Sequence, residues 1–168
     1  MDSSSTVVRV HRRVILIVLV SLSFFVARTT SAQLAKPNLS GTWELDLSKS
    51  KLSRVHSAGT DRYKIKHSEP QLLVEHMYSS GSIETSRYTT DGKECLPNPE
   101  HREQLAKAYW DGDTLVIEKH QETGQDRITW MFRYTLSQDG QSLAVTRHVT
   151  RNSYSADIDE SLVYEKQK

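Results

Sequence analysis

The segment Leu39-Ser40-Gly41-Thr42-Trp43-Glu44-Leu45-Asp46-Leu47 alternates between apolar and polar side chains. Trp43, Leu45 and Leu47 fall on one side of an extended chain, and Thr42, Glu44 and Asp46 fall on the other. An alternation with a period of two residues predicts a β-strand with one buried and one exposed face. We therefore expect the first strand of a β-rich domain here, ending at about Leu47.

The same alternation recurs in short segments between Arg62 and the C-terminal end of the chain. In an antiparallel pair, facing residues have a constant sum of residue numbers, and their side chains lie on the same side of the sheet. The position of each predicted turn therefore fixes which residues face each other in its hairpin, and so which side chains lie on the same face of the sheet. Six turns are predicted, at residues 68–71, 79–82, 111–112, 122–125, 139–140 and 151–156.

These turns place the apolar residues from Tyr63 to Tyr164 on a single face of the sheet. A wrong register in any hairpin would move its polar residues onto that face. The predicted facing pairs include Tyr63 with His76, Val74 with Arg87, Ala108 with Leu115, Ile117 with Trp130, Phe132 with Arg147, Arg147 with Glu160, and Val149 with Ile158.

The resulting fold class is all-β, an antiparallel up-and-down meander of about nine or ten strands. A long sheet with one apolar face curls and closes to bury that face, so we expect a barrel. An open curled sheet and a two-sheet sandwich are the alternatives. Segment 94–105 is the least regular part because Pro97 and Pro99 interrupt a strand, and residues 100–107 could form a helical turn instead.

The N-terminal residues have the composition of a secretory signal peptide. Arg9, Arg12 and Arg13 precede an apolar run over 14–27, and small residues follow at 30–32. We expect a signal peptide over 1–32 and a mature domain over 33–168, secreted or periplasmic. The run is shorter than the about 20 apolar residues of a membrane span, so we expect no stable span after cleavage. A retained N-terminal anchor is the alternative.

Composition narrows the function classes further. The chain of 168 residues has a net charge of +1 and no basic cluster outside the first 32 residues, so we expect no nucleic-acid partner. Cys95 is the single cysteine, which rules out an internal disulfide. The sequence has no nucleophile elbow, metal-binding motif or paired-carboxylate spacing, so we expect no catalytic residue, no metal and no cofactor. Oligomeric state stays open.

Two phrases of the sequence carry a family resemblance. Leu-Ser-Gly-Thr-Trp at 39–43 and Trp-Asp-Gly-Asp-Thr-Leu-Val-Ile-Glu at 110–118 resemble a family of uncharacterised lipocalin-like domains from secreted bacterial proteins. Gly-Thr-Trp and Val-Tyr-Glu-Lys, at 163–166, also resemble fatty-acid-binding proteins. Leu162 stands where that family has a ligand-binding arginine, and the sequence has no room for its helical lid. The resemblance therefore implies a lipocalin-like barrel.

Polar residues on the apolar face are the candidate functional residues, because a buried charge is costly unless it is paired. By resemblance to lipocalins, Arg147 would stack on Trp43 and, with Glu160 facing it, close one end of the barrel as a structural plug. A ligand anchor or a rim position are the alternatives for Arg147. Arg87 has no facing acid, so a ligand carboxylate or phosphate, or water at the barrel mouth, would satisfy it.

His67 and His76 could supply only two of the three or four ligands that a zinc site needs. We therefore interpret both as residues of the barrel core or rim. The aromatic residues form a core, and they form a binding wall if the barrel is wide enough. We expect an exported barrel that binds a small apolar or amphipathic molecule; the alternative is a non-catalytic structural or interaction module with a filled barrel. The candidate ligand-binding residues are Arg87, His76, His67, Tyr78, Trp110, Trp130, Phe132 and Tyr134.

Overall fold

The computed structural model describes residues 35–53, 61–153 and 156–168. The predicted signal peptide, residues 1–32, lies outside these ranges. Every regular element in the described part of the chain is a β-strand. Within the same ranges, no helical segment has the length and apolar character needed to cross a lipid bilayer.

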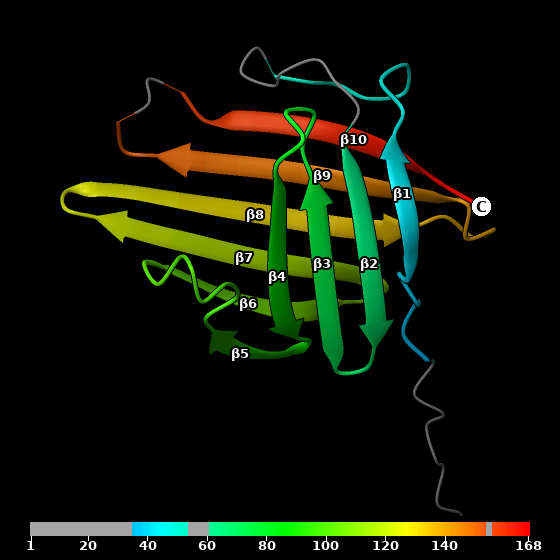
Figure 1. Cartoon of the computed structure of the whole chain (residues 1–168), viewed down its shortest axis with the longest axis horizontal. Helices are drawn as coiled ribbons and strands as arrows, with labels where there is room; N and C mark the ends of the chain where they lie inside the picture. Colours follow the sequence, from blue (N-terminus) through cyan, green and yellow to red (C-terminus); the bar gives the residue numbers. More distant parts are fainter. Residues whose placement is uncertain (1–34, 54–60, 154–155) are drawn as a thin grey trace, which may run out of the picture. The chain divides into compact units, whose positions relative to one another are not determined.

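Ten strands form one sheet, in which all hydrogen-bonded neighbours are antiparallel (Figure 1). Their order in the sheet is β4-β3-β2-β1-β10-β9-β8-β7-β6-β5. This is the predicted up-and-down meander, joined between its first and last strands. The strands are β1 (Gly41–Leu45), β2 (Arg62–Ser68), β3 (Gln71–Met77), β4 (Ile83–Thr89), β5 (Asp91–Cys95), β6 (Gln104–Asp111), β7 (Thr114–Thr123), β8 (Asp126–Leu136), β9 (Ser142–Arg151) and β10 (Ile158–Lys166).

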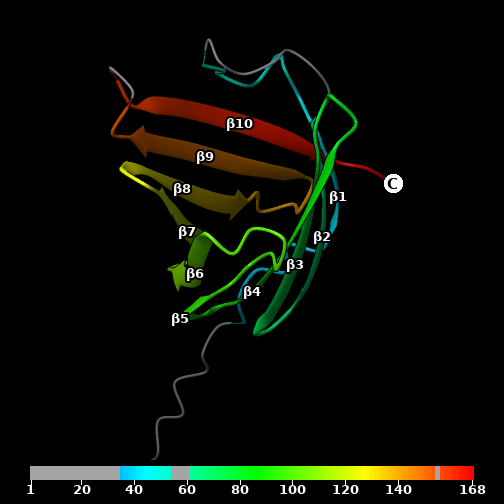
Figure 2. The same cartoon turned by 60° about the vertical axis from the view of Figure 1, so that its left-hand side comes forward.

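The sheet curls until β1–β4 face β6–β10 across a common interior (Figures 1 and 2). Its two edges are β4 and β5, which follow each other in the sequence. Beside this seam the Arg87 N–H donates to the Pro97 carbonyl over 2.9 Å. The sheet is therefore a nearly closed barrel, as the alternating sequence predicted.

Trp43 anchors the core, with no exposed surface. Its indole N–H donates to the Leu39 carbonyl over 3.0 Å, and Lys166 Nζ lies 5.2 Å from the centre of its ring. The strand is shorter than predicted, because Asp46 Oδ1 accepts the Ser48 N–H and turns the chain. Leu47 consequently lies outside β1 and is 44% exposed.

Three of the predicted hairpins have the predicted register. Tyr63 faces His76 between β2 and β3, Phe132 faces Arg147 between β8 and β9, and Arg147 faces Glu160 between β9 and β10. All these pairs lie on the interior face, so the predicted registers of these three hairpins are confirmed.

Two hairpins are displaced by two residues from the prediction. Ile117 faces Ala108 on β6 and Phe132 on β8, because the loops are Gly112-Asp113 and Gly124-Gln125. Both glycines have positive φ, 60° and 63°, at the first loop position, where a tight hairpin turn of type II′ needs glycine. A shift of two residues keeps every side chain on its predicted face.

The hairpin between β3 and β4 is displaced by one residue, and this changes the face of β4. Val74 faces Ser86, not Arg87, because the loop holds five residues, 78–82, instead of four. The Tyr78 N–H donates to the Ser82 carbonyl and closes this longer loop. The inward position of Arg87 was therefore predicted wrongly: Arg87 is exposed on the outer face, and Glu84 and Ser86 face the interior.

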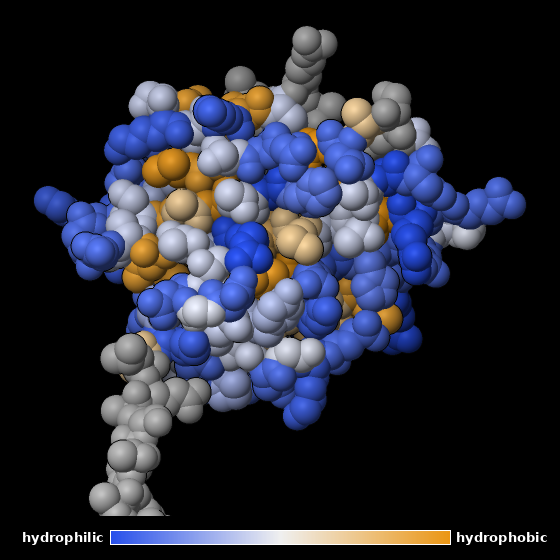
Figure 3. Space-filling view, turned by 180° about the vertical axis from the view of Figure 1, so that it is seen from behind, coloured by the Kyte–Doolittle hydropathy of each residue, from blue (hydrophilic) through white to orange (hydrophobic). Residues whose placement is uncertain are grey.

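The segment before β6 does not form the helical turn that was one alternative for residues 100–107. Asn98 and His101 carbonyls accept the N–H groups of His101 and Gln104, respectively, in two successive turns, and β6 begins at Gln104. On the outer face of the barrel seen in Figure 3, apolar side chains form small areas separated by charged ones. Ion pairs such as Lys107–Glu118, 2.8 Å apart, link neighbouring strands at the surface.

Candidate ligand site

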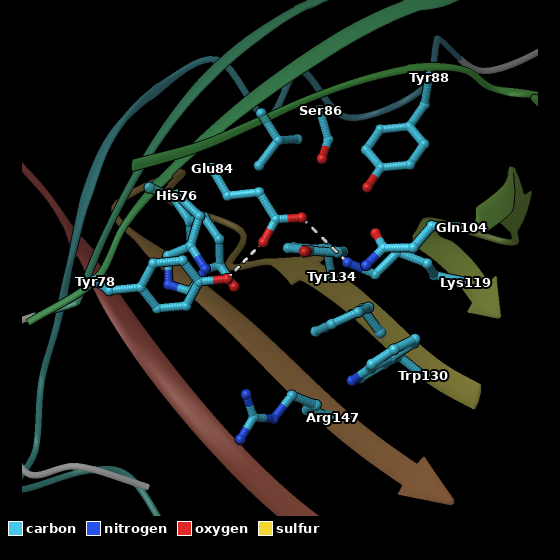
Figure 4. Close-up of a pocket in the computed structure, with 13 residues that line it drawn as sticks. His76, Tyr78, Glu84, Ser86, Tyr88, Gln104, Lys119, Trp130, Tyr134 and Arg147 are labelled. Atoms are coloured by element: carbon cyan, nitrogen blue, oxygen red, sulfur yellow. Dashed lines mark hydrogen bonds and ion pairs between the residues drawn. The ribbon is translucent and has the colours of Figure 1, made fainter. Parts of the chain in front are cut away.

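A cavity of about 200 Å³ lies inside the barrel, between β2–β4 on one side and β6–β9 on the other (Figure 4). Its aromatic wall comes from β8, where Trp130, Phe132 and Tyr134 follow the period of two residues that the sequence showed. Its polar lining comes from other strands and from the loop before β4. The polar residues include His76, Tyr78, Glu84, Ser86, Gln104, Lys119 and Arg147.

Glu84 is the centre of a small hydrogen-bonded group. The Tyr78 hydroxyl donates to Glu84 Oε2 over 2.7 Å, and Lys119 Nζ donates to Glu84 Oε1 over 3.2 Å (Figure 4). Burial alone would raise the pKa of the Glu84 carboxyl, but Lys119 and the hydrogen bond from Tyr78 outweigh it and hold the pKa below its usual value. Glu84 is therefore ionised at neutral pH.

Lys119 completes this group from the opposite side of the barrel. Its side chain is only 12% exposed, and its Nζ lies 5.1 Å from the centre of the Trp130 ring. A cation over an indole face is stabilised by the quadrupole of the ring. Lys119 therefore joins the polar and the aromatic parts of the cavity.

His76 is packed between two aromatic rings, with centroid distances of 4.4 Å to Tyr63 and 4.0 Å to Tyr78. Its Nε2 lies 3.5 Å from Asp61 Oδ2. Burial raises the pKa of Tyr63 to about 12, so this phenol stays neutral. The His76 side of the cavity is thus a rigid aromatic stack backed by a carboxylate.

Arg147 lines the cavity from β9, and its Nη2 lies 2.5 Å from Glu160 Oε2. Glu160 also accepts hydrogen bonds from the Ser53 N–H and hydroxyl, over 3.0 and 2.6 Å. The predicted ion pair is therefore present. The predicted stacking of Arg147 on Trp43 is wrong, because Lys166 faces Trp43 across β1 and β10 and occupies that position.

The structure brings together part of the predicted ligand set. His76, Tyr78, Trp130, Phe132 and Tyr134 all line the cavity. The three other residues of that set lie elsewhere. They are Arg87 on the outer face, and His67 and Trp110, which meet away from this cavity.

His67 and Trp110 are held by Glu69. Glu69 Oε1 lies 2.9 Å from His67 Nε2 and accepts the Trp110 indole N–H over 2.6 Å, while Thr90 donates to Oε2. His67 Nδ1 accepts the Leu39 N–H over 3.3 Å, so the proton of the neutral ring lies on Nε2. This cluster ties β2, β6 and the turn between β4 and β5 to the segment before β1, which is a structural role.

Seven residues that line the cavity were not among the predicted candidates: Tyr63, Val74, Glu84, Ser86, Tyr88, Gln104 and Lys119. Glu84 was not predicted to face the interior because the predicted register between β3 and β4 was wrong by one residue. Gln104 and Lys119 could have been found, because each extends the alternation of its strand by one more step, before Ala106 and after Ile117. Among the residues described, no three His, Cys, Asp or Glu side chains are arranged to hold a metal ion.

Replacing Glu84 by glutamine tests whether this carboxylate stabilises the barrel. At neutral pH we expect a loss of about 1.5–3 kcal/mol in the free energy of unfolding, the usual contribution of hydrogen bonds to a charged group. A carboxyl with a lowered pKa in the folded state stabilises above its unfolded pKa, and this contribution is lost as the pH falls through the folded pKa. The difference between wild type and Glu84→Gln should therefore shrink on acidification.

Urea unfolding at neutral and acidic pH measures this difference. Glu75→Gln is the matched control, since Glu75 lies on the outer face of neighbouring β3, 3.6 Å from Lys64, where an ion pair contributes at most about 1 kcal/mol. A difference between wild type and Glu84→Gln that stays constant with pH would contradict the assignment.

Comparisons with known proteins concern the fold. No protein-family model matches the chain, and none of the curated proteins matches it. A secretory abundant heat soluble protein from Ramazzottius varieornatus is similar in structure, with a TM-score of 0.59 and 16% identity over 79% of this chain and 98% of that one. Zebrafish ileal bile acid-binding protein, complexed with cholic acid, has a TM-score of 0.56 and 12% identity, over 76% of this chain and 98% of that one.

A fatty acid transporter variant has a TM-score of 0.54 and 12% identity, over 77% of this chain and 98% of that one. At such low identities these likenesses establish the architecture alone, a barrel of the lipocalin and fatty-acid-binding-protein kind. They agree with the predicted fold class.

Proposed function

We propose that this chain is an exported β-barrel that binds a small apolar or amphipathic molecule in the cavity beside Trp130 and Glu84. The observation that carries the proposal is a cavity of about 200 Å³ with an aromatic wall on one side and hydrogen-bonding groups on the other. A cavity of about 150 Å³ accommodates benzene, and ligand pockets usually measure about 300–1,000 Å³. The expected ligand is therefore a single ring or a short chain.

The similar solved structures support the binding part of the proposal. The zebrafish protein is complexed with cholic acid, and a second protein is a fatty acid transporter. Because one fold can host many functions, this support is an analogy, and the cavity itself is the stronger argument. Export is supported by the basic residues at 9–13, the apolar run over 14–27 and the small residues at 30–32.

Filling the cavity tests the proposal. Ser86 is buried and lines the cavity, so Ser86→Leu should remove ligand binding without opening the barrel. Thr85→Leu, one residue away on the outer face of β4, is the matched control and should bind as wild type does. Titrations with indole, benzyl alcohol and decanoate, followed by tryptophan fluorescence, measure binding, and native mass spectrometry detects a molecule retained from the host.

If wild type binds none of these probes and retains no molecule, the ligand-binding proposal fails and the filled-barrel module takes its place. The export part has its own measurement, which is N-terminal sequencing of protein recovered outside the cytoplasm. The sequence should begin at or near Gln33, and an intact Met1 on that protein would contradict cleavage.

A further inference from the structure

The charged side chains around the cavity are already paired with one another. Lys119 Nζ lies 3.2 Å from Glu84 Oε1, and Arg147 Nη2 lies 2.5 Å from Glu160 Oε2. Both pairs are partly buried: the Glu160 side chain has no exposed surface and that of Lys119 is 12% exposed, while Arg147 and Glu84 are 23% and 24% exposed. The charges of the cavity wall are thus balanced within the protein.

Two polar groups of the wall still have hydrogen-bonding capacity. Arg147 Nε is buried and has no acceptor within the described residues, although its Nη2 is paired with Glu160. Gln104 uses one end of its amide to donate to Gln121 over 3.0 Å, and its buried Oε1 has no donor among the same residues. Two residues that line the wall thus carry one unused donor and one unused acceptor, both buried, on different strands, β9 and β6.

We propose that the cavity selects a ligand with no net charge that carries both a hydrogen-bond acceptor and a hydrogen-bond donor, and that it discriminates against carboxylates such as fatty acids. The inference rests on the proposed function, since it names the ligand class of the same site. It also replaces the expectation of an arginine anchor for an anionic ligand.

The physical reason is the cost of an unmatched charge in a partly buried site. A carboxylate entering the cavity would lose part of its hydration and would add a negative charge beside Glu84 and Glu160, whose cationic partners are already neutralised. A cationic ligand would approach Lys119 and Arg147 in the same way. A neutral ring with an amide or hydroxyl group would pair with Arg147 Nε and Gln104 Oε1 and leave both ion pairs intact.

Two ligands of nearly identical shape test this selectivity, 4-hydroxybenzamide and 4-hydroxybenzoate. Near neutral pH the first is uncharged and the second is an anion, and both have the size of one substituted ring. We expect the amide to bind the wild-type protein at least about tenfold more tightly than the carboxylate, measured by ligand-observed NMR titration. Equal or tighter binding of the carboxylate would overturn the inference.

The Glu84→Gln variant tests the cause of this selectivity. Without the Glu84 charge, Lys119 becomes available to an anion, so the preference for 4-hydroxybenzamide over 4-hydroxybenzoate should fall about tenfold from wild type to this variant. Glu75→Gln on the outer face removes the same charge from the protein and should change neither affinity. An unchanged preference in Glu84→Gln would overturn the inference.

The experiments distinguish a failure of the selectivity for neutral ligands from a failure of the proposed ligand binding. If decanoate binds to wild type and Ser86→Leu abolishes that binding, the barrel binds ligands but its selectivity for neutral molecules is refuted. If 4-hydroxybenzamide binds at least about tenfold more tightly than 4-hydroxybenzoate and Ser86→Leu abolishes its binding, both statements are supported. If neither compound, nor any other probe, binds to wild type, both fail.

Discussion

Replacing Trp43 by alanine is expected to lower the free energy of unfolding by about 3–5 kcal/mol, which is typical of removing a buried aromatic side chain. Trp43 has no exposed surface, and its indole N–H donates to the Leu39 carbonyl. The substitution leaves both a cavity and a buried carbonyl that has lost its donor. Because small domains are stable by only about 5–15 kcal/mol, the variant should keep a small part of its stability or unfold.

Trp130→Ala is the matched control, because it removes the same side chain from the same barrel. Trp130 is partly exposed at the cavity and makes its contact with Lys119 there, so we expect a clearly smaller loss than for Trp43→Ala. Urea unfolding followed by far-UV circular dichroism measures both variants independently of tryptophan fluorescence. Equal losses would show that the two indoles are equally buried in solution, contrary to the structure.

The fold could be predicted from the sequence because an error of two residues in the register of a hairpin does not change the face on which a side chain lies. The loops Gly112-Asp113 and Gly124-Gln125 were both misplaced, yet Ile117 and Trp130 kept their interior positions. Side chains on a strand repeat every second residue, so an even error changes the partner and preserves the face. The interior aromatic wall was therefore predicted correctly from an incorrect register.

The candidate site was less predictable because the error in the loop before β4 was odd. One extra loop residue turned Arg87 outward and Glu84 inward, which exchanged a predicted cation for an acid at the centre of the cavity. Tyr78-Ser79-Ser80-Gly81-Ser82 contains several residues suited to turns, so its composition does not fix its length. The predicted charge of the cavity was therefore wrong because the sequence does not determine the length of the loop at 78–82.

Contacts between strands that meet only when the barrel closes could also not be predicted from the sequence. Arg147 and Glu160 face each other across one hairpin, so their pairing followed from local register. Lys166 reaches Trp43 only because β10 pairs with β1, strands from opposite ends of the domain. Glu69 similarly joins His67 to Trp110 across the barrel. Such contacts depend on curvature and closure, which an alternating pattern does not specify.

Replacing Arg147 by methionine is expected to destabilise the protein by about 3–5 kcal/mol, the usual effect of removing one partner from a buried ion pair. The Glu160 side chain has no exposed surface, so loss of the Arg147 cation leaves a negative charge in a site that water does not reach. Arg147 itself is 23% exposed and borders the cavity. Glu160→Gln should therefore cost less, because the remaining guanidinium can reach solvent.

The double variant Arg147→Met/Glu160→Met distinguishes this explanation from a simple loss of packing. Apolar side chains of similar volume often replace a buried ion pair without loss of stability, so the double variant should be more stable than Arg147→Met alone. Thermal and urea unfolding of the wild type, Arg147→Met, Glu160→Met and the double variant Arg147→Met/Glu160→Met complete the cycle. If the two single losses merely add, the residues do not interact energetically, and the 2.5 Å contact between Arg147 and Glu160 does not stabilise the barrel.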